Sequence, residues 1–130
     1  MTNIVAFAKV LGDATRWRIV RLVLENALCV CELADILVMP QSSVSSHVQI
    51  LRKAGLLESE KAGKWTYFRI GKPHRKIIRD LARCFDDSSS RERAKDSAKA
   101  VARLAIRAQS CCPGPRVLVS HRKNPNSVQA

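Results

Sequence analysis

The stretch from Cys29 to Leu51 constrains the fold more than any other part of this chain. It predicts two short helices joined by a tight corner, because apolar residues recur at helical spacing on both sides of a polar break. The first helix carries Leu33, Ile36 and Leu37 on its apolar side. The second carries Val44, Val48 and Leu51, at spacings i, i+4 and i+7. Gly55 stands where a left-handed residue is expected to end the second helix.

The opposite face of the second helix is polar but uncharged. Short hydrogen-bonding side chains of this kind can reach base edges and phosphates in a DNA groove. The candidates for DNA contact on this helix are Gln41, Ser42, Ser45, Ser46 and His47. The helix pair is therefore predicted to be a DNA-reading helix-turn-helix.

The pattern after Gly55 changes from helical to extended. Leu56–Lys61 and Trp65–Ile70 are predicted strands, with Ala62 and Gly63 in the turn between them. Lys61 and Lys64 flank the tip, where they suit phosphate contacts that add affinity but little sequence information. A solvated basic hairpin is the alternative. The predicted fold is mainly α with a small β-hairpin, a winged helix-turn-helix.

Helices are also predicted on both sides of this unit. One spans residues 2–11, a second starts at the N-cap Asp13, and a third opens at Pro73. The third has an apolar stripe of Ile77, Ile78, Leu81, Ala82 and Phe85. A domain of about 85 residues has a small core, so the apolar faces of the first and third helices predict a homodimer.

The rest of the chain is predicted to be less ordered. Residues 1–85 form the DNA-binding and dimerisation domain. Residues 86–109 are predicted to be a linker followed by a basic, Ala-rich helix, which either packs on the dimer or is marginal and frays. Its weak apolar face would consist of Ala98, Val101, Ala102, Ala105 and Ile106. Residues 110–130, with three prolines, are predicted to be a disordered tail.

Charge and cysteine content narrow the function further. A formal charge of +12 on 130 residues favours a nucleic-acid or anionic-surface partner over mere solubility. No apolar run approaches the roughly 18 residues of a membrane span, and no signal peptide is visible. Five cysteines without a secretion signal predict a reducing cytosol, where thiols more often bind metal than cross-link a fold.

Several blocks of sequence resemble one family, in the same order. They are Leu11–Ile19, Ala27–Leu33, Pro40–His47, Leu51–Leu57 and Gly63–Ile70. Together they resemble the ArsR/SmtB family of bacterial metal-responsive repressors, and Cys29-Val-Cys31 resembles its arsenic- and antimony-responsive branch most closely. The resemblance implies a cytoplasmic, nucleoid-associated homodimer on double-stranded operator DNA. It needs no cofactor to bind DNA and is released by As(III) or Sb(III).

Cys29 and Cys31 are the first candidate ligands, because these soft ions prefer thiolates. In a regular helix, positions i and i+2 point about 200° apart. Two such sulfurs cannot both reach one small ion while the helix is intact, so ligation is expected to distort the helix start and misplace the helix that reads DNA. The alternative is that both are small buried hydrophobes.

A third thiolate is expected for As(III), and its source is open. Many arsenic-responsive relatives place it where this chain has Ala34. Cys111 and Cys112 are the candidates, although an incidental tail feature or an oxidation-prone dithiol would give the same pair. The first ten residues hold no cysteine, so the cadmium-type arrangement is not expected. Cys84 is predicted to pack beside Leu81 and Phe85.

The resulting hypothesis is a metalloid-responsive transcriptional repressor, and not an enzyme. Its first rival is a thiol redox switch acting through Cys29 and Cys31 or through Cys111 and Cys112. A rival from another class is a basic protein that coats DNA without sequence preference and whose thiols are inert. No zinc site is expected on the helix after Pro73, where Lys76–Arg83 offers only Asp80.

Overall fold

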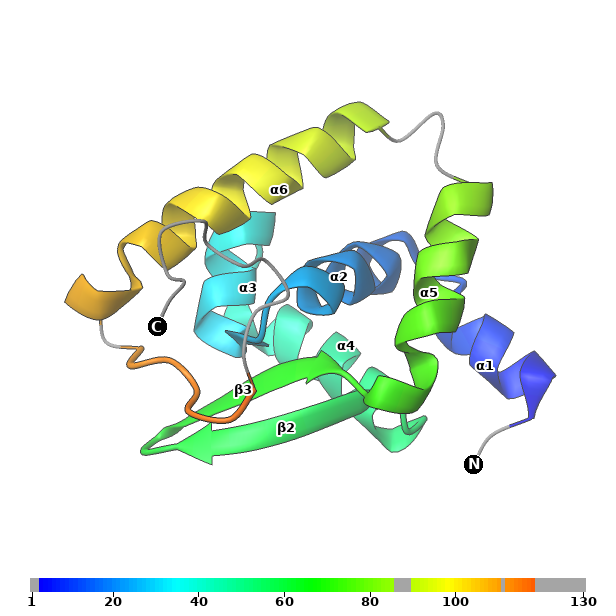
Figure 1. The fold of residues 1–130 in the computed structure, drawn as a ribbon, viewed down its shortest axis with the longest axis horizontal. Helices are drawn as coiled ribbons and strands as arrows, with labels where there is room; N and C mark the ends of the chain where they lie inside the picture. Colours follow the sequence, from blue (N-terminus) through cyan, green and yellow to red (C-terminus); the bar gives the residue numbers. More distant parts are fainter. Residues whose placement is uncertain (1–2, 86–89, 111, 119–130) are drawn as a thin grey trace.

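A computed structural model of the chain describes residues 3–85, 90–110 and 112–118 (Figure 1). The helices are α1 (Ile4–Leu11), α2 (Ala14–Glu25), α3 (Val30–Leu37), α4 (Gln41–Lys53), α5 (Lys72–Cys84) and α6 (Ser90–Ala105), followed by a 3₁₀ turn, η1 (Arg107–Gln109). The strands are β1 (Leu28–Cys29), β2 (Leu57–Ala62) and β3 (Trp65–Ile70). Within the described residues, no helix has the length and apolar character needed to cross a membrane.

The boundaries of the helix-turn-helix follow from local backbone chemistry. The Asp13 carboxylate accepts the Arg16 N–H at 3.0 Å and caps α2, as the sequence predicts. The corner between α3 and α4 begins at Val38, whose φ of 55° is unusual for a β-branched residue. Gly55, at a φ of 80°, follows α4 in the predicted left-handed conformation.

The sheet contains the predicted hairpin and one strand that the sequence does not reveal. Its order is β1-β3-β2, and both pairings are antiparallel. In this register Tyr67 of β3 lies opposite Cys29 of β1 on one side and opposite Glu60 of β2 on the other. These three residues therefore form a row across the sheet, from the start of α3 to the wing.

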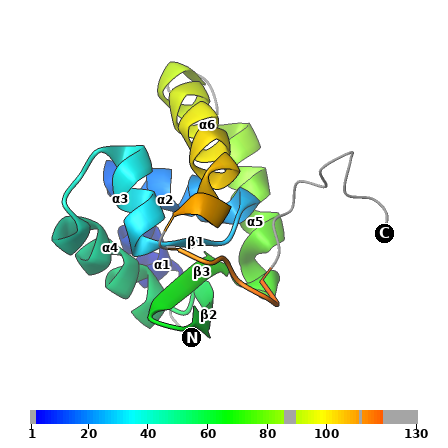
Figure 2. The same ribbon diagram turned by 90° about the vertical axis from the view of Figure 1, so that its left-hand side faces the viewer.

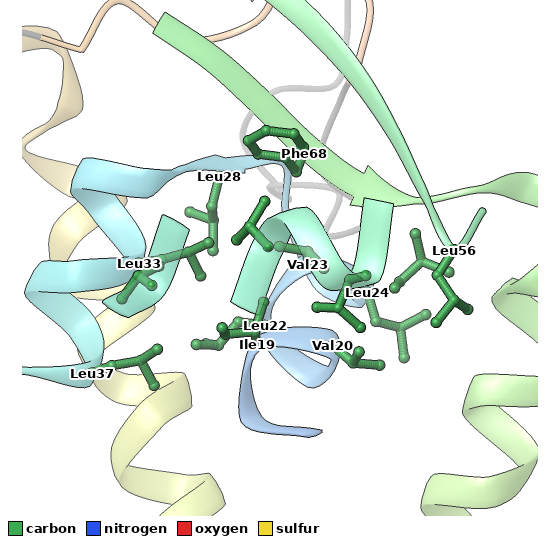
Figure 3. Packing of buried hydrophobic residues seen from close by; sticks show 14 of the residues in the cluster. Ile19, Val20, Leu22, Val23, Leu24, Leu28, Leu33, Leu37, Leu56 and Phe68 are labelled. Atoms are coloured by element: carbon green, nitrogen blue, oxygen red, sulfur yellow. The ribbon is translucent and has the colours of Figure 1, made fainter. Parts of the chain in front are cut away.

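The core fills the space between α2, α3, α4 and the sheet (Figure 3). Its fully buried members include Ile19, Val20, Val23, Leu28, Leu33, Val44, Val48, Leu51 and Leu56. Each such side chain contributes roughly 1.5–3 kcal/mol by leaving water. The predicted apolar faces of the two short helices are confirmed.

The helix α6 lies against α2 and α3, on the opposite side of them from the wing (Figures 1 and 2). The predicted apolar face of this helix is wrong, since Val101 and Ile106 are 48% and 50% exposed. Its inner face instead buries Asp96, Ala100 and Arg103. The polar residues face inward because α2 and α3 carry charged partners for them. Arg18 of α2, for example, donates two hydrogen bonds of 2.9 Å to Asp96.

The helices α1 and α5 lie together at one end of the molecule, where Phe7 stacks on His74 (Figure 1). Part of the predicted stripe on α5 is buried, through Ile78 and Ala82. Of the other stripe residues, Leu81 is half-buried, whereas Ile77 and Phe85 are 45% and 71% exposed in this single chain. On α1, Ile4 and Val5 are likewise 71% and 61% exposed. Cys84 is also exposed, so the single chain does not show the predicted packing of Cys84 beside Leu81 and Phe85.

Candidate metal centre and nucleic-acid interface

Three thiols from distant parts of the sequence meet beside the sheet. The sulfurs of Cys29, Cys31 and Cys112 all lie within 4.8 Å of one another. Cys29 Sγ donates to Cys112 Sγ at 3.4 Å. Cys29 ends β1, Cys31 lies in the first turn of α3, and Cys112 follows η1. Of the two candidate tail cysteines, the structure thus brings Cys112 to the pair; Cys111 is outside the described residues.

The start of α3 differs from the sequence-based expectation. Cys29 has φ −92° and ψ 170°, which is extended, and the helix begins only at Val30. The expectation that the two sulfurs of Cys29 and Cys31 diverge as on a regular helix is therefore wrong. The strand β1 turns Cys29 toward Cys31, so the pair can approach one ion without unwinding a helical turn.

The thiol cluster is largely shielded from water. Cys29 is 2% exposed and Cys112 is fully buried, in a small apolar group with Ala27 and Tyr67. Burial, the main cause, raises the pKa of the Cys29 thiol. Burial likewise raises the pKa of Tyr67 to about 12. Because ligand thiols must be deprotonated, binding of an ion here should release protons.

A buried carboxylate organises the charges around the thiols. Glu32 of α3 is fully buried and accepts the backbone N–H of Cys29 at 3.2 Å. It also accepts two hydrogen bonds of 2.7 Å from Arg107, whose guanidinium lies over the Tyr67 ring. Arg103 places Nη1 3.9 Å from Glu32 and donates through Nη2 to Cys112 Sγ at 3.7 Å. One guanidinium group, that of Arg103, therefore lies where thiolate charge would develop on Cys112, and both arginines balance the charge of Glu32.

Sequence reasoning missed this shell of Glu32, Arg103 and Arg107. One signal was present: Glu32 stands three residues after Cys29, at the position of a capping-box carboxylate. Its burial could not be predicted, because the arginines that compensate its charge are 71 and 75 residues away, or more than half the chain. Their contact depends on how α6 packs.

The donor set suits an ion that takes three soft ligands. Cysteine–zinc bonds of about 2.3 Å would bring tetrahedral sulfurs about 3.8 Å apart, so separations up to 4.8 Å need only a modest contraction. Tetrahedral zinc would require a fourth ligand. Among the described residues the group contains three ligand atoms, and the nearby Glu32 oxygens are already bonded to Arg107. The arrangement fits a trigonal ion better than a tetrahedral one.

The residues predicted to read DNA lie on α4, away from α6. Gln41, Ser42 and Ser46 are exposed, whereas Ser45 and His47 are half-buried. Ser46 Oγ donates to the Ser42 carbonyl at 3.0 Å, so its hydroxyl is partly engaged within the helix. His47 Nδ1 lies 3.4 Å from Arg16 Nη1. Arg16 also donates to the Val10 carbonyl at 2.6 Å, so its guanidinium is engaged within the protein.

The wing presents the two predicted lysines. Lys61 and Lys64 are both exposed beside the turn at Gly63, whose φ is 64°. The α4 face and the wing tip together make a polar and basic surface of the kind that reads a groove and its flanking phosphates. The fold and this surface define a winged helix-turn-helix protein, with a thiol cluster beside the first helix of the motif.

Comparison with known proteins identifies the family. Residues 13–59 match the model described as "Bacterial regulatory protein, arsR family". Over 82 residues, 58% of this chain and 69% of the relative, the chain is 43% identical to the arsenical resistance operon repressor of Escherichia coli. The chain belongs to the arsR family of bacterial regulatory proteins, which confirms the resemblance found in the sequence.

Two further proteins are similar to this chain, one in sequence and one in fold. Over 69 residues the chain is 39% identical to the cadmium resistance regulatory protein CadC of Listeria innocua, covering 52% of this chain and 58% of CadC. A homodimeric winged helix-turn-helix DNA-binding domain from Mycobacterium bovis superposes with a TM-score of 0.60 at 24% identity, covering 64% of this chain and 78% of that domain. The winged helix-turn-helix fold is thereby confirmed.

Proposed function

We propose that this chain is a transcriptional repressor that binds operator DNA as a homodimer and is released when As(III) or Sb(III) binds Cys29, Cys31 and Cys112. The observation that carries the proposal is the meeting of these three sulfurs within 4.8 Å. The relative from Escherichia coli is itself an arsenical resistance operon repressor. The function is binding and release in the cytoplasm, without catalysis.

The apolar surface on α1 and α5 supports the dimer. Ile4, Val5, Ile77 and Phe85 are exposed at one end of the fold, and pairing would remove them from water. The Mycobacterium bovis domain of the same fold is homodimeric. Two copies of α4 would then meet successive major grooves of a palindromic site. Sedimentation of the reduced protein should give twice its mass of 14.5 kDa.

The position of the thiols supports the coupling between ion and DNA. Cys29 and Cys31 flank the first residue of α3, and α3 packs directly on α4. Contraction of the three sulfurs around one ion displaces the start of α3 against the sheet. Because α4 reads DNA from a surface fixed by α3, this displacement should weaken operator binding.

The test is an electrophoretic shift with reduced, full-length protein and a DNA fragment that the protein itself selects from a random pool. Arsenite is titrated against wild type, Cys29→Ser, Cys31→Ser and Cys112→Ser. Cys84→Ser is the matched control, since Cys84 is exposed on α5. All five should bind the fragment. The three cluster variants should need more arsenite by a larger factor than the roughly 10–100-fold that loss of an outer-shell partner costs.

If Cys29→Ser or Cys112→Ser leaves the DNA at the arsenite concentration that releases the wild type, the substituted cysteine is not a ligand of the ion. Cadmium and zinc are titrated in parallel, because CadC is a cadmium resistance regulator. If cadmium or zinc releases the protein from DNA and arsenite does not, the proposal of a repressor stands, but its effector ion is cadmium or zinc.

One observation favours a second candidate, a redox switch. Cys29 Sγ and Cys112 Sγ are 3.4 Å apart, so a peroxide could oxidise the two thiols to a disulfide while being reduced itself. The same shift assay with peroxide in place of arsenite separates the two functions. Release by peroxide that is lost in Cys112→Ser, with no response to arsenite, would favour the switch.

A further inference from the structure

The segment after η1 crosses the sheet along one row of residues. Cys112 meets Cys29 of β1, and the Gly114 N–H donates to Tyr67 Oη of β3 at 2.7 Å. The segment then reaches Glu60 of β2. These three partners are the row defined by the strand register. In Figure 1 the segment is the orange stretch that returns from the end of α6 to the strands.

A single carboxylate holds the far end of this segment. Glu60 accepts three backbone N–H groups, from Arg116 at 2.5 Å, Val117 at 2.7 Å and Leu118 at 2.8 Å. Hydrogen bonds to an ionised acceptor are roughly twice as strong as neutral ones. The three N–H groups of Arg116, Val117 and Leu118 also hold the pKa of the Glu60 carboxyl below its ordinary value of 4.5, that of Arg116 having the largest effect.

The backbone of residues 112–118 has no helix or strand of its own, so none of its N–H groups is satisfied by a regular hydrogen-bond ladder. Pro113 and Pro115 have no N–H to satisfy. The Cys112 N–H donates to Ser110 Oγ, that of Gly114 to Tyr67, and the remaining three to Glu60. Beyond Gly114, all the backbone N–H groups of this segment that donate to the sheet therefore donate to Glu60.

We infer that Glu60, on the wing strand β2, is a positioning residue for the third ligand of the ion site, Cys112. This inference rests on the proposed function of the thiol cluster. Without the Glu60 carboxylate the segment loses its anchor beyond Gly114, and Cys112 spends less time against Cys29. Glu60 also precedes Lys61 directly, so the strand that anchors the ion ligand is the strand that carries a wing lysine toward DNA.

The test compares Glu60→Gln with Glu58→Gln. Glu58 lies on the same strand and has the same charge, but it pairs with Arg75 of α5 at 2.5 Å. The first measurement is the rate at which N-ethylmaleimide alkylates Cys112 in the ion-free protein, followed by peptide mass spectrometry. Wild type and Glu58→Gln should be protected because Cys112 is fully buried. Glu60→Gln should react roughly tenfold faster, because the segment that holds Cys112 against Cys29 opens more often.

The second measurement is arsenite affinity, from the absorbance of the bound thiolates. Glu60→Gln should bind roughly 10-fold more weakly, at the low end of the range for outer-shell partners of a metal site. Cys29→Ser should be weaker still. Glu58→Gln should bind as wild type does.

Unchanged alkylation of Cys112 in Glu60→Gln would overturn the inference. Faster alkylation with wild-type arsenite affinity would overturn it too, because Cys112 would then not need its anchor. If the wild type fails to bind arsenite, the proposed function fails and Glu60 positions no ion ligand. The alkylation rates would still show in that case whether Glu60 holds the segment.

Discussion

The winged-helix body and the C-terminal region, residues 90–118, are held by different forces. The body, α1 to α5 with the sheet, is built on an apolar cluster that runs through α2, α3 and α4 (Figure 3). The C-terminal region adds Ala100 and the half-buried Leu104 to that cluster. It also places Cys112 and the partly buried Leu118 in the small apolar group of Ala27 and Tyr67. Most of its remaining attachments are polar: Asp96 to Arg18, Arg103 and Arg107 to Glu32, and three backbone N–H groups to Glu60.

Because of this difference, the body can stay folded while the attachment of the C-terminal region changes. Apolar burial fixes the body whatever the protonation of nearby groups. Ion pairs and charge-assisted hydrogen bonds are stronger in a dry site but respond to pH, to salt and to an added ion. A region that carries one ligand of an ion site and is attached by charge can be drawn closer or released without unfolding the DNA-reading unit.

The largest expected effect is on the body, through Leu33→Ala. Leu33 is fully buried at the centre of α3. Truncation should lower the free energy of unfolding by about 3 kcal/mol, because a cavity remains where the side chain was. Urea unfolding followed by circular dichroism measures this as a single shifted transition. A loss below about 1 kcal/mol would mean that α3 is not part of the body core.

A smaller effect is expected where the two regions meet, through Glu32→Gln. The amide still accepts the Cys29 N–H but no longer balances the charges of Arg103 and Arg107. The loss should be about 2 kcal/mol, the scale of a hydrogen bond to a charged group. It should appear as loss of helix signal from α6 at urea concentrations where the body stays folded.

Asp35→Asn is the matched control for that prediction. Asp35 is on the same helix and accepts from Arg103 at 2.9 Å, but its side chain is 63% exposed. Water screens such a pair, so the loss should stay below about 1 kcal/mol. Equal losses in Glu32→Gln and Asp35→Asn would contradict the claim that buried charge joins the two regions.

The same division explains which parts of the fold could be predicted from sequence. In the body, apolar periodicity located α3 and α4, and turn residues such as Gly55 located their ends. The strand β1 was missed because Leu28–Cys29 is two residues long and its pairing with β3 is not local. On α6 the same reasoning selected Val101 and Ile106, which are exposed, because charged partners on α2 and α3 decide which face turns inward.

The residues of the candidate site also differ in how far they could be predicted from sequence. Cys29 and Cys31 are recognisable in sequence because they are close together in it. Cys112 could be proposed only as one of two tail thiols, since its approach to Cys29 depends on the path of α6 and η1. The role of Glu60 could not be predicted from sequence, because nothing in the sequence distinguishes it from Glu58 on the same strand. Its role depends on the contacts with residues 116–118, which only the structure shows.

The smallest effect is expected at Glu60, where acid should loosen the last contact of the C-terminal region and leave the body intact. The backbone N–H groups of Arg116, Val117 and Leu118, with that of Arg116 first, depress the pKa of this carboxyl in the folded chain. A depressed folded pKa means that the contact stabilises above the unfolded value of 4.5 and is lost as pH falls through the folded value. In an NMR titration, the three amide protons should shift together with a midpoint below 4.5, and Glu60→Gln should abolish the shift. The amides of the core residues Leu33 and Val44 should not follow this midpoint. Amide shifts at residues 116–118 with a midpoint at or above 4.5 would mean that the Glu60 carboxylate does not hold the segment in solution.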